Sequence, residues 1–312
     1  MPEVALPAFA KVNLRLDVVG RRADGYHELR TIFQTISLHD TLRLDWNRGG
    51  AIELEIAGNA ALAAESARSN LVYRALDALR DELGITRGVR ARLDKRIPAG
   101  RGLGGGSSDA AAALAGLLRL SRRRIPLARL IEIAAQLGSD VPFFLFGGRA
   151  AGLGRGEQIL PLPDAPTRGV LVVSPRAVAV STRDAYSWLA LPRAAIHSTR
   201  SASLRLTNPR AASRLTKFCA LCWSPQEAPL SNDFERAVFK RHPLLGRIKR
   251  ELLRRGAEDA ALAGSGSAVF GLFRNPAQAR RTAHWFPKEE VFVCSTVSRV
   301  QVRRALGESV IV

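Results

Sequence analysis

A glycine-rich run is the first part of the sequence that indicates chemistry. The segment Arg96–Leu118 reads RIPAGRGLGGGSSDAAAALAGLL, in which five glycines within seven residues precede an alanine-rich stretch. Glycine loses more backbone freedom on folding than any other residue, so this cluster implies that a ligand approaches the backbone closely. A phosphate group fits, because free N–H groups and the helix dipole favour an anion at a helix N-terminus.

The residues around these glycines distinguish between three kinds of phosphate loop. A Walker A loop needs a lysine before the Ser or Thr, whereas Gly106 is followed by Ser107 and Ser108. The dinucleotide pattern G-x-G-x-x-G is met, but it also requires an acidic residue about 20 residues further on. The stretch at that distance has no acidic residue, and the next one is Glu132. We therefore expect a loop that opens directly into a helix, with Ser107 or Ser108 capping it or meeting magnesium. A tight turn without a ligand is the alternative.

Two isolated charges lie in otherwise apolar stretches and are natural partners. Lys11 lies in LPAFAKVNLRL and Asp140 in LGSDVPFFLF. A buried charge is costly unless it is paired, and a lysine beside an aspartate keeps the carboxylate ionised. Such an aspartate can accept the proton of an alcohol that attacks phosphorus. The sequence leaves the alternative equally open, in which Lys11 extends to solvent and Asp140 caps the helix that follows it.

The elements that position these residues can be read from the hydrophobic pattern. Alternating runs predict strands at 10–20, 28–38, 40–46, 51–58, 88–98, 169–175 and 290–296, and hairpins at 149–162 and 259–273. Helices are predicted at 71–84, 107–119, 127–138, 231–243 and 244–256, with another from about 276. The segment from about 175 to 226 is poorly periodic. We expect two closely packed α/β domains, 1–165 and 166–312.

Composition limits the kind of protein. The 312 residues are 46% hydrophobic and 24% charged, and no apolar run reaches the roughly 18–20 residues that span a bilayer. Three cysteines make no disulfide framework, and the pair Cys219 and Cys222 has no further ligands at zinc-site spacing. We expect a cytoplasmic protein, a monomer or weak homodimer. The net charge is +19, and the segment 185–226 has no acidic residue. Nucleic-acid binding is therefore an alternative, although aromatic interleaving is missing.

Together these motifs resemble the GHMP kinase superfamily. Three stretches carry the resemblance: PAFAKVNLRLDVVGRRADGYHEL, PAGRGLGGGSSDAAAAL and LAGSGSAVF. GSDVPFF and the SND of Ser231–Asp233 add to it. ADGYH is particular to the branch that acts in the non-mevalonate isoprenoid pathway. The resemblance implies an α+β fold, with an N-terminal domain like ribosomal protein S5, a ferredoxin-like C-terminal domain and a cleft between them. Rival members of the superfamily phosphorylate homoserine, mevalonate or a sugar.

The resemblance also implies roles for individual residues. It makes Lys11 and Asp140 the catalytic pair, and it implies transfer of the ATP γ-phosphate to a tertiary hydroxyl with Mg²⁺, for which Ser108 is the candidate ligand. The nucleotide loop is Pro98, Ala99, Gly100, Arg101, Gly102, Leu103, Gly104, Gly105, Gly106, Ser107 and Ser108. The small-molecule substrate carries a cytidine diphosphate, held by Asn13, Tyr26, His27 and Tyr186. Tyr26 and Tyr186 are expected to sandwich the base.

Overall fold

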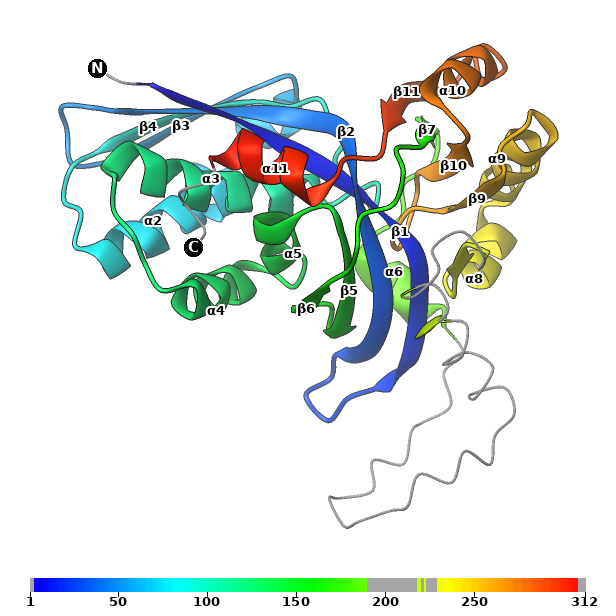
Figure 1. The fold of residues 1–312 in the computed structure, drawn as a ribbon, viewed down its shortest axis with the longest axis horizontal. Helices are drawn as coiled ribbons and strands as arrows, with labels where there is room; N and C mark the ends of the chain where they lie inside the picture. Colours follow the sequence, from blue (N-terminus) through cyan, green and yellow to red (C-terminus); the bar gives the residue numbers. More distant parts are fainter. Residues whose placement is uncertain (1–2, 190–217, 220–221, 223–228, 308–312) are drawn as a thin grey trace.

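The computed structural model describes residues 3–189, 218–219, 222 and 229–307, and most of their strands belong to one large sheet (Figure 1). Its strands are β1 (Val4–Arg21), β2 (His27–Trp46), β3 (Ile52–Ala57), β4 (Val89–Asp94), β5 (Arg149–Gly154), β6 (Gln158–Pro161) and β8 (Ser231–Asn232). The order is β3-β4-β2-β1-β8. In addition, β5 pairs with the first half of β2, and β6 pairs with β5. β3 with β4 and β1 with β8 are parallel pairs, while the other pairs are antiparallel.

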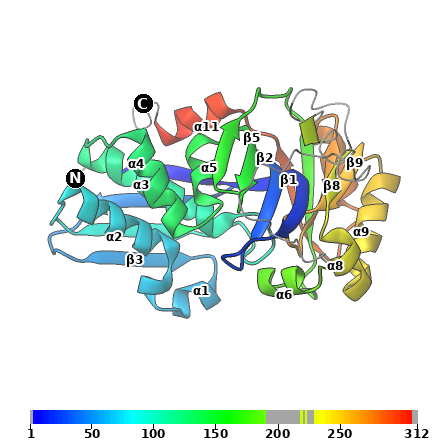
Figure 2. The ribbon, with the colours of Figure 1, turned by 90° about the horizontal axis from the view of Figure 1, so that it is seen from below.

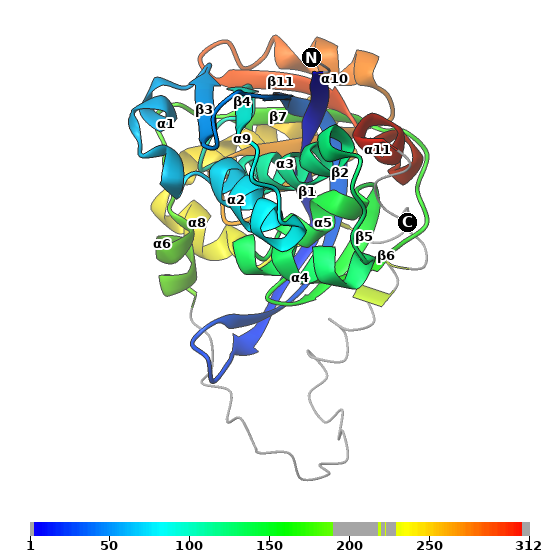
Figure 3. The same ribbon diagram turned by 90° about the vertical axis from the view of Figure 1, so that its left-hand side faces the viewer.

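A layer of helices packs on this large sheet. It consists of α1 (Ala60–Ala64), a 3₁₀ turn at Ala67–Ser69, α2 (Leu71–Leu83), α3 (Gly105–Ser121), α4 (Leu127–Leu137) and α5 (Val141–Phe146). Figure 3 looks onto α2, α3 and α5. α3 is alanine-rich because it lies close to the strands: a Cβ on Gly116 would come within 2.6 Å of a Leu44 methyl group. The small side chains thus allow the close packing of helix and sheet.

The second sheet is built by the later part of the chain. Its order is β11 (Glu290–Ser295), β7 (Gly169–Ser174), β10 (Val269–Phe273) and β9 (Asp259–Leu262), all antiparallel. The helices of this part are α6 (Thr182–Ser187), α8 (Glu235–Arg241), α9 (Pro243–Arg254) and α10 (Pro276–Ala283). α6 lies between the β1–β2 hairpin and α8 (Figure 2). The last helix, α11 (Arg299–Leu306), returns to the large sheet and contacts β1, α3 and α5.

An apolar layer joins the two sheets. Val12 and Ile36 from the large sheet share one buried cluster with Val172 and Phe270 from the small sheet. Thr35 adds a backbone link, because its carbonyl accepts a 2.9 Å hydrogen bond from the N–H of Val297. The close packing expected from the sequence is therefore present, and it gives the residues between the sheets a fixed frame.

Most of the predicted elements form, with three informative differences. The strands predicted at 28–38 and 40–46 are one strand, β2, which continues through a register shift opposite Phe9 and Ala10. α3 begins at Gly105, two residues earlier than predicted, because Gly104 adopts the left-handed conformation at its N-cap. Helix α11 was not predicted, although Ser298 and Gln301 form a capping box that is visible in the sequence.

The α+β, two-part architecture is confirmed, whereas the domain boundary stays a prediction. β8 and α11 both follow residue 166 in the chain yet contact β1. Most of the basic segment 185–226 lies outside the described residues. Among the described residues, no helix has the length and apolar character that crossing a bilayer requires.

Candidate active site

A cavity of about 1370 Å³ lies between the two halves of the fold, lined by residues from both. Single small-molecule sites usually measure about 300–1,000 Å³, so this space suits two ligands side by side. Every site residue predicted above lines it except Ser108, which is buried in α3. The glycine-rich loop, Lys11 and Asp140 all line the cavity, and so do Tyr26, His27 and Tyr186, whose surroundings we call the aromatic end.

The glycine-rich loop forms a concave run of backbone amides at the start of α3. Gly100, Gly102 and Gly104 all have positive φ, between 66° and 78°, at alternate positions. Alternating left-handed and right-handed residues direct successive N–H groups to one side, which makes a nest for an anion. The loop is fixed on two sides. The N–H of Lys11 donates to the carbonyl of Leu103 at 3.0 Å, and a Cβ on Gly102 would meet the Ala263 carbonyl oxygen at 1.9 Å.

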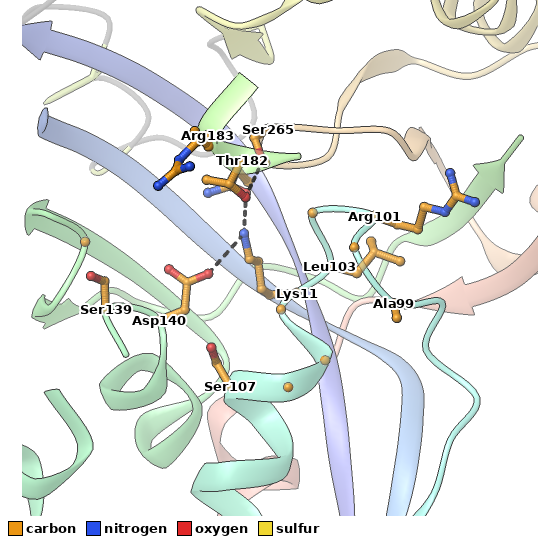
Figure 4. A pocket seen from close by; sticks show the side chains of 18 of the residues that line it. Lys11, Ala99, Arg101, Leu103, Ser107, Ser139, Asp140, Thr182, Arg183 and Ser265 are labelled. Atoms are coloured by element: carbon orange, nitrogen blue, oxygen red, sulfur yellow. Dashed lines mark hydrogen bonds and ion pairs between the residues drawn. The ribbon is translucent and has the colours of Figure 1, made fainter. Parts of the chain in front are cut away.

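The two isolated charges of the sequence meet in the cavity (Figure 4). Lys11 Nζ lies 3.5 Å from Asp140 Oδ2 and donates a 2.8 Å hydrogen bond to Asn13 Oδ1. Asn13 in turn donates to Thr31 Oγ1 at 2.7 Å, so the lysine is held from the strand side. The Lys11 side chain is 5% exposed and that of Asp140 is 31% exposed.

This arrangement excludes the structural alternatives for both residues. Lys11 is buried and does not extend to solvent. Asp140 occupies the N-cap position of α5, but its side chain makes no capping hydrogen bond. Its carboxylate is instead beside an ammonium group and open to the cavity, which leaves it free to accept a proton from a bound alcohol.

The aromatic end differs in one respect from the expected sandwich. Tyr186 stacks on His27, with ring centroids 4.5 Å apart, while the guanidinium of Arg155 lies 4.8 Å from the Tyr26 ring centroid. Tyr26 is 54% exposed and therefore offers a ring face to a ligand. A base between Tyr26 and Tyr186 stays a prediction. Burial and the charge of Arg21 lower the pKa of His27, which favours a neutral ring that can both donate and accept hydrogen bonds.

The charge of Asp140 affects Tyr186 at the aromatic end. Burial and the charge of Asp140 raise the pKa of Tyr186, so the phenol keeps its proton.

Thr182, at the start of α6, lies 3.2 Å from the Ser265 hydroxyl in the second glycine-rich turn, 263–268 (Figure 4). The second glycine cluster noted in the sequence thus borders the same cavity as the first.

A buried ionic cluster beside the glycine-rich loop was missed by sequence reasoning. Lys95 Nζ donates to Asp40 Oδ2 at 2.5 Å and to Asp109 Oδ2 at 2.6 Å, and all three side chains are at most 4% exposed. Asp40 Oδ1 also accepts from the N–H groups of Arg96 and Ile97, where the loop begins. The signal was available: Val89, Ala91 and Leu93 alternate on the inner face of β4, and the same period places Lys95 there.

The cluster carries two carboxylates for one ammonium. Burial, helped by the charge of Asp40, raises the pKa of Asp109 to about 8 against the opposing effect of Lys95. Burial lowers the pKa of Lys95, but the charges of Asp109 and Asp40 outweigh it and raise that pKa overall. The cluster therefore retains a proton on a carboxyl group near neutral pH.

The donor set in the cavity suits a magnesium ion that arrives with a nucleotide. Ser107 supplies a hydroxyl that lines the cavity. The described residues contain no cluster of three or more His, Cys, Asp or Glu side chains that would hold a metal alone. Magnesium usually takes one or two protein oxygens together with substrate phosphates, so a single protein donor fits. The hydroxyl that lines the cavity is Ser107, whereas Ser108 is buried and lines a separate small cavity with Pro7, Phe9 and Ala112.

The fold and this site are those of a small-molecule kinase family, and sequence comparison agrees. Residues 70–148 match the N-terminal domain of GHMP kinases and residues 216–288 match the C-terminal domain. A curated relative from Solibacter usitatus, a 4-diphosphocytidyl-2-C-methyl-D-erythritol kinase, is 44% identical over 97% of this chain and 93% of its own. The chain therefore belongs to the GHMP kinase family. It is an ATP-dependent small-molecule kinase.

Further relatives carry the same name. A 4-diphosphocytidyl-2-C-methyl-D-erythritol kinase from Pelotomaculum thermopropionicum is 38% identical over 93% of this chain and 96% of its own. A crystal structure of 4-(cytidine 5'-diphospho)-2C-methyl-D-erythritol kinase superposes with a TM-score of 0.74 at 34% identity, and the match covers 94% of this chain and 99% of that one. A homoserine kinase from Cytophaga hutchinsonii, 18% identical with a TM-score of 0.70, shares the fold.

Proposed function

We propose that this protein transfers the γ-phosphate of ATP to the 2-hydroxyl of 4-diphosphocytidyl-2-C-methyl-D-erythritol, giving the 2-phosphate and ADP in isoprenoid precursor synthesis. The observation that carries the proposal is that three kinds of group line one cavity. They are the amide-lined loop, the Lys11–Asp140 pair, and the rings of Tyr26, His27 and Tyr186. The similarity to relatives of this name supports the same substrate.

The nucleotide end is suited to a triphosphate. The N–H groups of Gly100–Ser107 and the N-terminus of α3 supply donors and a partial positive charge for the phosphates. Only glycine permits this backbone path, because a Cβ on Gly102 or Gly104 would clash with Ala263 or Phe144. Ser107 is the residue that would hold Mg²⁺, which when bound neutralises charge on the phosphate oxygens.

The transfer itself needs a base and a cation. Asp140 accepts the proton of the acceptor hydroxyl as that oxygen forms a bond to the γ-phosphorus, and the bond from phosphorus to the bridging oxygen of ADP breaks. Lys11 attracts the forming alkoxide, since its ammonium lies 3.5 Å from the Asp140 carboxylate that receives the proton. Asn13 and Thr31 fix the lysine in that position through the hydrogen bonds described above.

The aromatic end is suited to a cytosine base. Tyr26 presents an exposed ring, and a base that stacks there takes the place of the Arg155 guanidinium. His27, kept neutral by burial and by Arg21, can hydrogen-bond to a base edge. Homoserine, mevalonate and sugars have no base to occupy this end, which favours the cytidylated substrate over those of other GHMP kinases.

The test is ADP release with three acceptors. We expect fast turnover with 4-diphosphocytidyl-2-C-methyl-D-erythritol and little above background with mevalonate or homoserine. CDP should also protect the protein against thermal unfolding, because a ligand that binds only the folded chain raises its stability. Comparable turnover with homoserine, or no stabilisation by CDP, would refute the assignment of the aromatic end.

A further inference from the structure

Arg101 lies in the nucleotide loop, yet its side chain points to the other half of the fold. Its Nη1 donates to the Ser267 hydroxyl at 2.6 Å and to the carbonyl oxygen of Val178. Ser267 Oγ donates to the same carbonyl at 2.8 Å and is completely buried. The guanidinium thus closes a triangle of hydrogen bonds between three segments of the chain, and no carboxylate among the described residues pairs with it.

The backbone of Arg101 contacts the same turn as its side chain. The carbonyl of Arg101 accepts a 3.3 Å hydrogen bond from the N–H of Ala268. The next residue, Gly102, packs so closely on Ala263 that no side chain fits between them. The loop and the turn 263–268 are therefore packed directly against each other and form one unit.

Val178 connects this unit to the aromatic end of the cavity. It belongs to the segment that leads into α6, and both Val178 and Val180 are buried in the apolar cluster against which Tyr186 packs. Thr182 and Tyr186 of α6 line the cavity, and Thr182 meets Ser265 of the turn. A displacement of the loop at Arg101 is therefore transmitted to the residues around the proposed cytidine site.

We propose that Arg101 is a positioning residue that couples the nucleotide site to the acceptor site. The inference rests on the proposed function. A triphosphate held by the loop fixes its position, Arg101 then fixes the Val178 segment, and α6 presents Tyr186 in the arrangement that accepts the cytidylated substrate. The coupling is reciprocal, because each ligand must change the affinity of the other by the same factor.

The alternative role for Arg101 is direct contact with a nucleotide phosphate. That role weakens nucleotide binding alone, whereas a coupling role changes how much one ligand strengthens the other. The diagnostic quantity is therefore a ratio: the Kd of 4-diphosphocytidyl-2-C-methyl-D-erythritol without ADP divided by its Kd with saturating ADP. ADP and the acceptor form a complex that cannot react, so calorimetry can measure both constants.

In the unmodified protein we expect the ratio to exceed about five, the lower end of typical coupling between sites. Arg101→Ala should bring it close to one, and Arg101→Lys should give an intermediate value because an ammonium can still reach one acceptor. Ser267→Ala removes two bonds of the triangle, leaves only the one between Arg101 and Val178, and should also lower the ratio. Arg96→Ala is the matched control, since Arg96 flanks the same loop with an exposed side chain. A ratio near one in the unmodified protein, or an unchanged ratio in Arg101→Ala, would overturn the proposal.

A second measurement separates this proposal from the choice of substrate. Hydrogen exchange of residues 176–187 can be followed with ADP alone, so it needs no acceptor. We expect ADP to increase protection of this segment in the unmodified protein and in Arg96→Ala, but not in Arg101→Ala. The absence of any ADP effect in the unmodified protein would reject the coupling, whatever the acceptor proves to be.

Discussion

Lys11 Nζ lies 3.5 Å from Asp140 Oδ2, although the two residues come from the first strand and the start of a short helix far along the chain. The pair is asymmetric. The ammonium is buried and hydrogen-bonded to Asn13, whereas the carboxylate is partly open to the cavity. This asymmetry fits different roles for the two residues: the lysine is held in place, and the aspartate exchanges a proton with a ligand.

Replacing Asp140 tests the base directly. Asp140→Asn keeps the shape of the side chain but cannot accept a proton, so we expect kcat to fall by about 10²–10⁴-fold. Nucleotide affinity should change little, because the loop amides are untouched. Steady-state ADP release and calorimetry with ADP measure the two quantities. Asp77→Asn, on the exposed face of α2, is the control. Normal turnover by Asp140→Asn would disprove its role as base.

Tyr26 should affect only one of the two substrates. Stacking of a base on an aromatic side chain contributes about 1–3 kcal/mol, so Tyr26→Ala should raise the KM for the cytidylated acceptor by about 5–100-fold. The KM for ATP, measured at saturating acceptor, should stay within about two-fold, since Tyr26 is not part of the loop. Tyr26→Phe retains the ring and should behave almost normally. Equal losses for both substrates would argue against base stacking at this residue.

The sequence was most informative where a residue type conflicts with its surroundings. Glycines before an alanine-rich helix, and single charges within the apolar stretches around Lys11 and Asp140, each break a local pattern, and such breaks tend to mark functional sites. The period of β4 would have placed Lys95 inside as well. These features are local, so one sequence contains the information needed to find them.

Other features depend on contacts between distant segments and have no local signal. Arg101 reaches Val178 and Ser267 only because the loop passes beside the turn 263–268. The stacking of Tyr186 on His27 likewise depends on how α6 meets the β1–β2 hairpin. The choice between Ser107 and Ser108 is a matter of helical phase, since successive residues point about 100° apart. The sequence predicts a hydroxyl near the phosphates but not which one.

Two glycines of the loop form a matched pair for testing its backbone. Both have positive φ, but a Cβ on Gly100 meets nothing within 4 Å, whereas one on Gly102 would lie 1.9 Å from a carbonyl oxygen. Gly100→Ala should therefore cost about 1 kcal/mol of unfolding free energy, from the left-handed conformation alone. Gly102→Ala should cost about 2–5 kcal/mol and abolish nucleotide binding. Urea unfolding compares them, and similar costs would contradict the contact with Ala263.

The two serines at the start of α3 provide a comparable pair for the metal. Ser107 lines the cavity and Ser108 packs inside the protein. Ser107→Ala should raise the Mg²⁺ concentration for half-maximal activity about ten-fold, as expected for loss of one contact to a charged group. Ser108→Ala should leave this concentration unchanged and affect stability instead. Magnesium titrations of initial rate decide between them, and a shift confined to Ser108→Ala would restore the assignment made from the sequence.

The cluster of Lys95, Asp40 and Asp109 predicts how stability depends on pH. Asp109 binds its proton more tightly in the folded chain, with a pKa of about 8, than in the unfolded chain. That proton stabilises the fold fully below the unfolded pKa of about 4, and the contribution is lost as pH rises through about 8. In Asp109→Asn the cluster keeps one ammonium and one carboxylate, and the second negative charge cannot form. It should therefore lose less stability than the parent between pH 6 and pH 9.

Thermal unfolding at the two pH values measures this difference. We expect the fall in Tm from pH 6 to pH 9 to be smaller in Asp109→Asn by about 2 °C or more. Asp40→Asn is the contrasting variant, because Asp40 also accepts the N–H groups of Arg96 and Ile97 and its loss leaves the start of the loop unsupported. It should unfold at a lower temperature than the parent at both pH values. Parallel pH profiles for Asp109→Asn and the parent would show that Asp109 is ionised throughout, with Lys95 outweighing its burial.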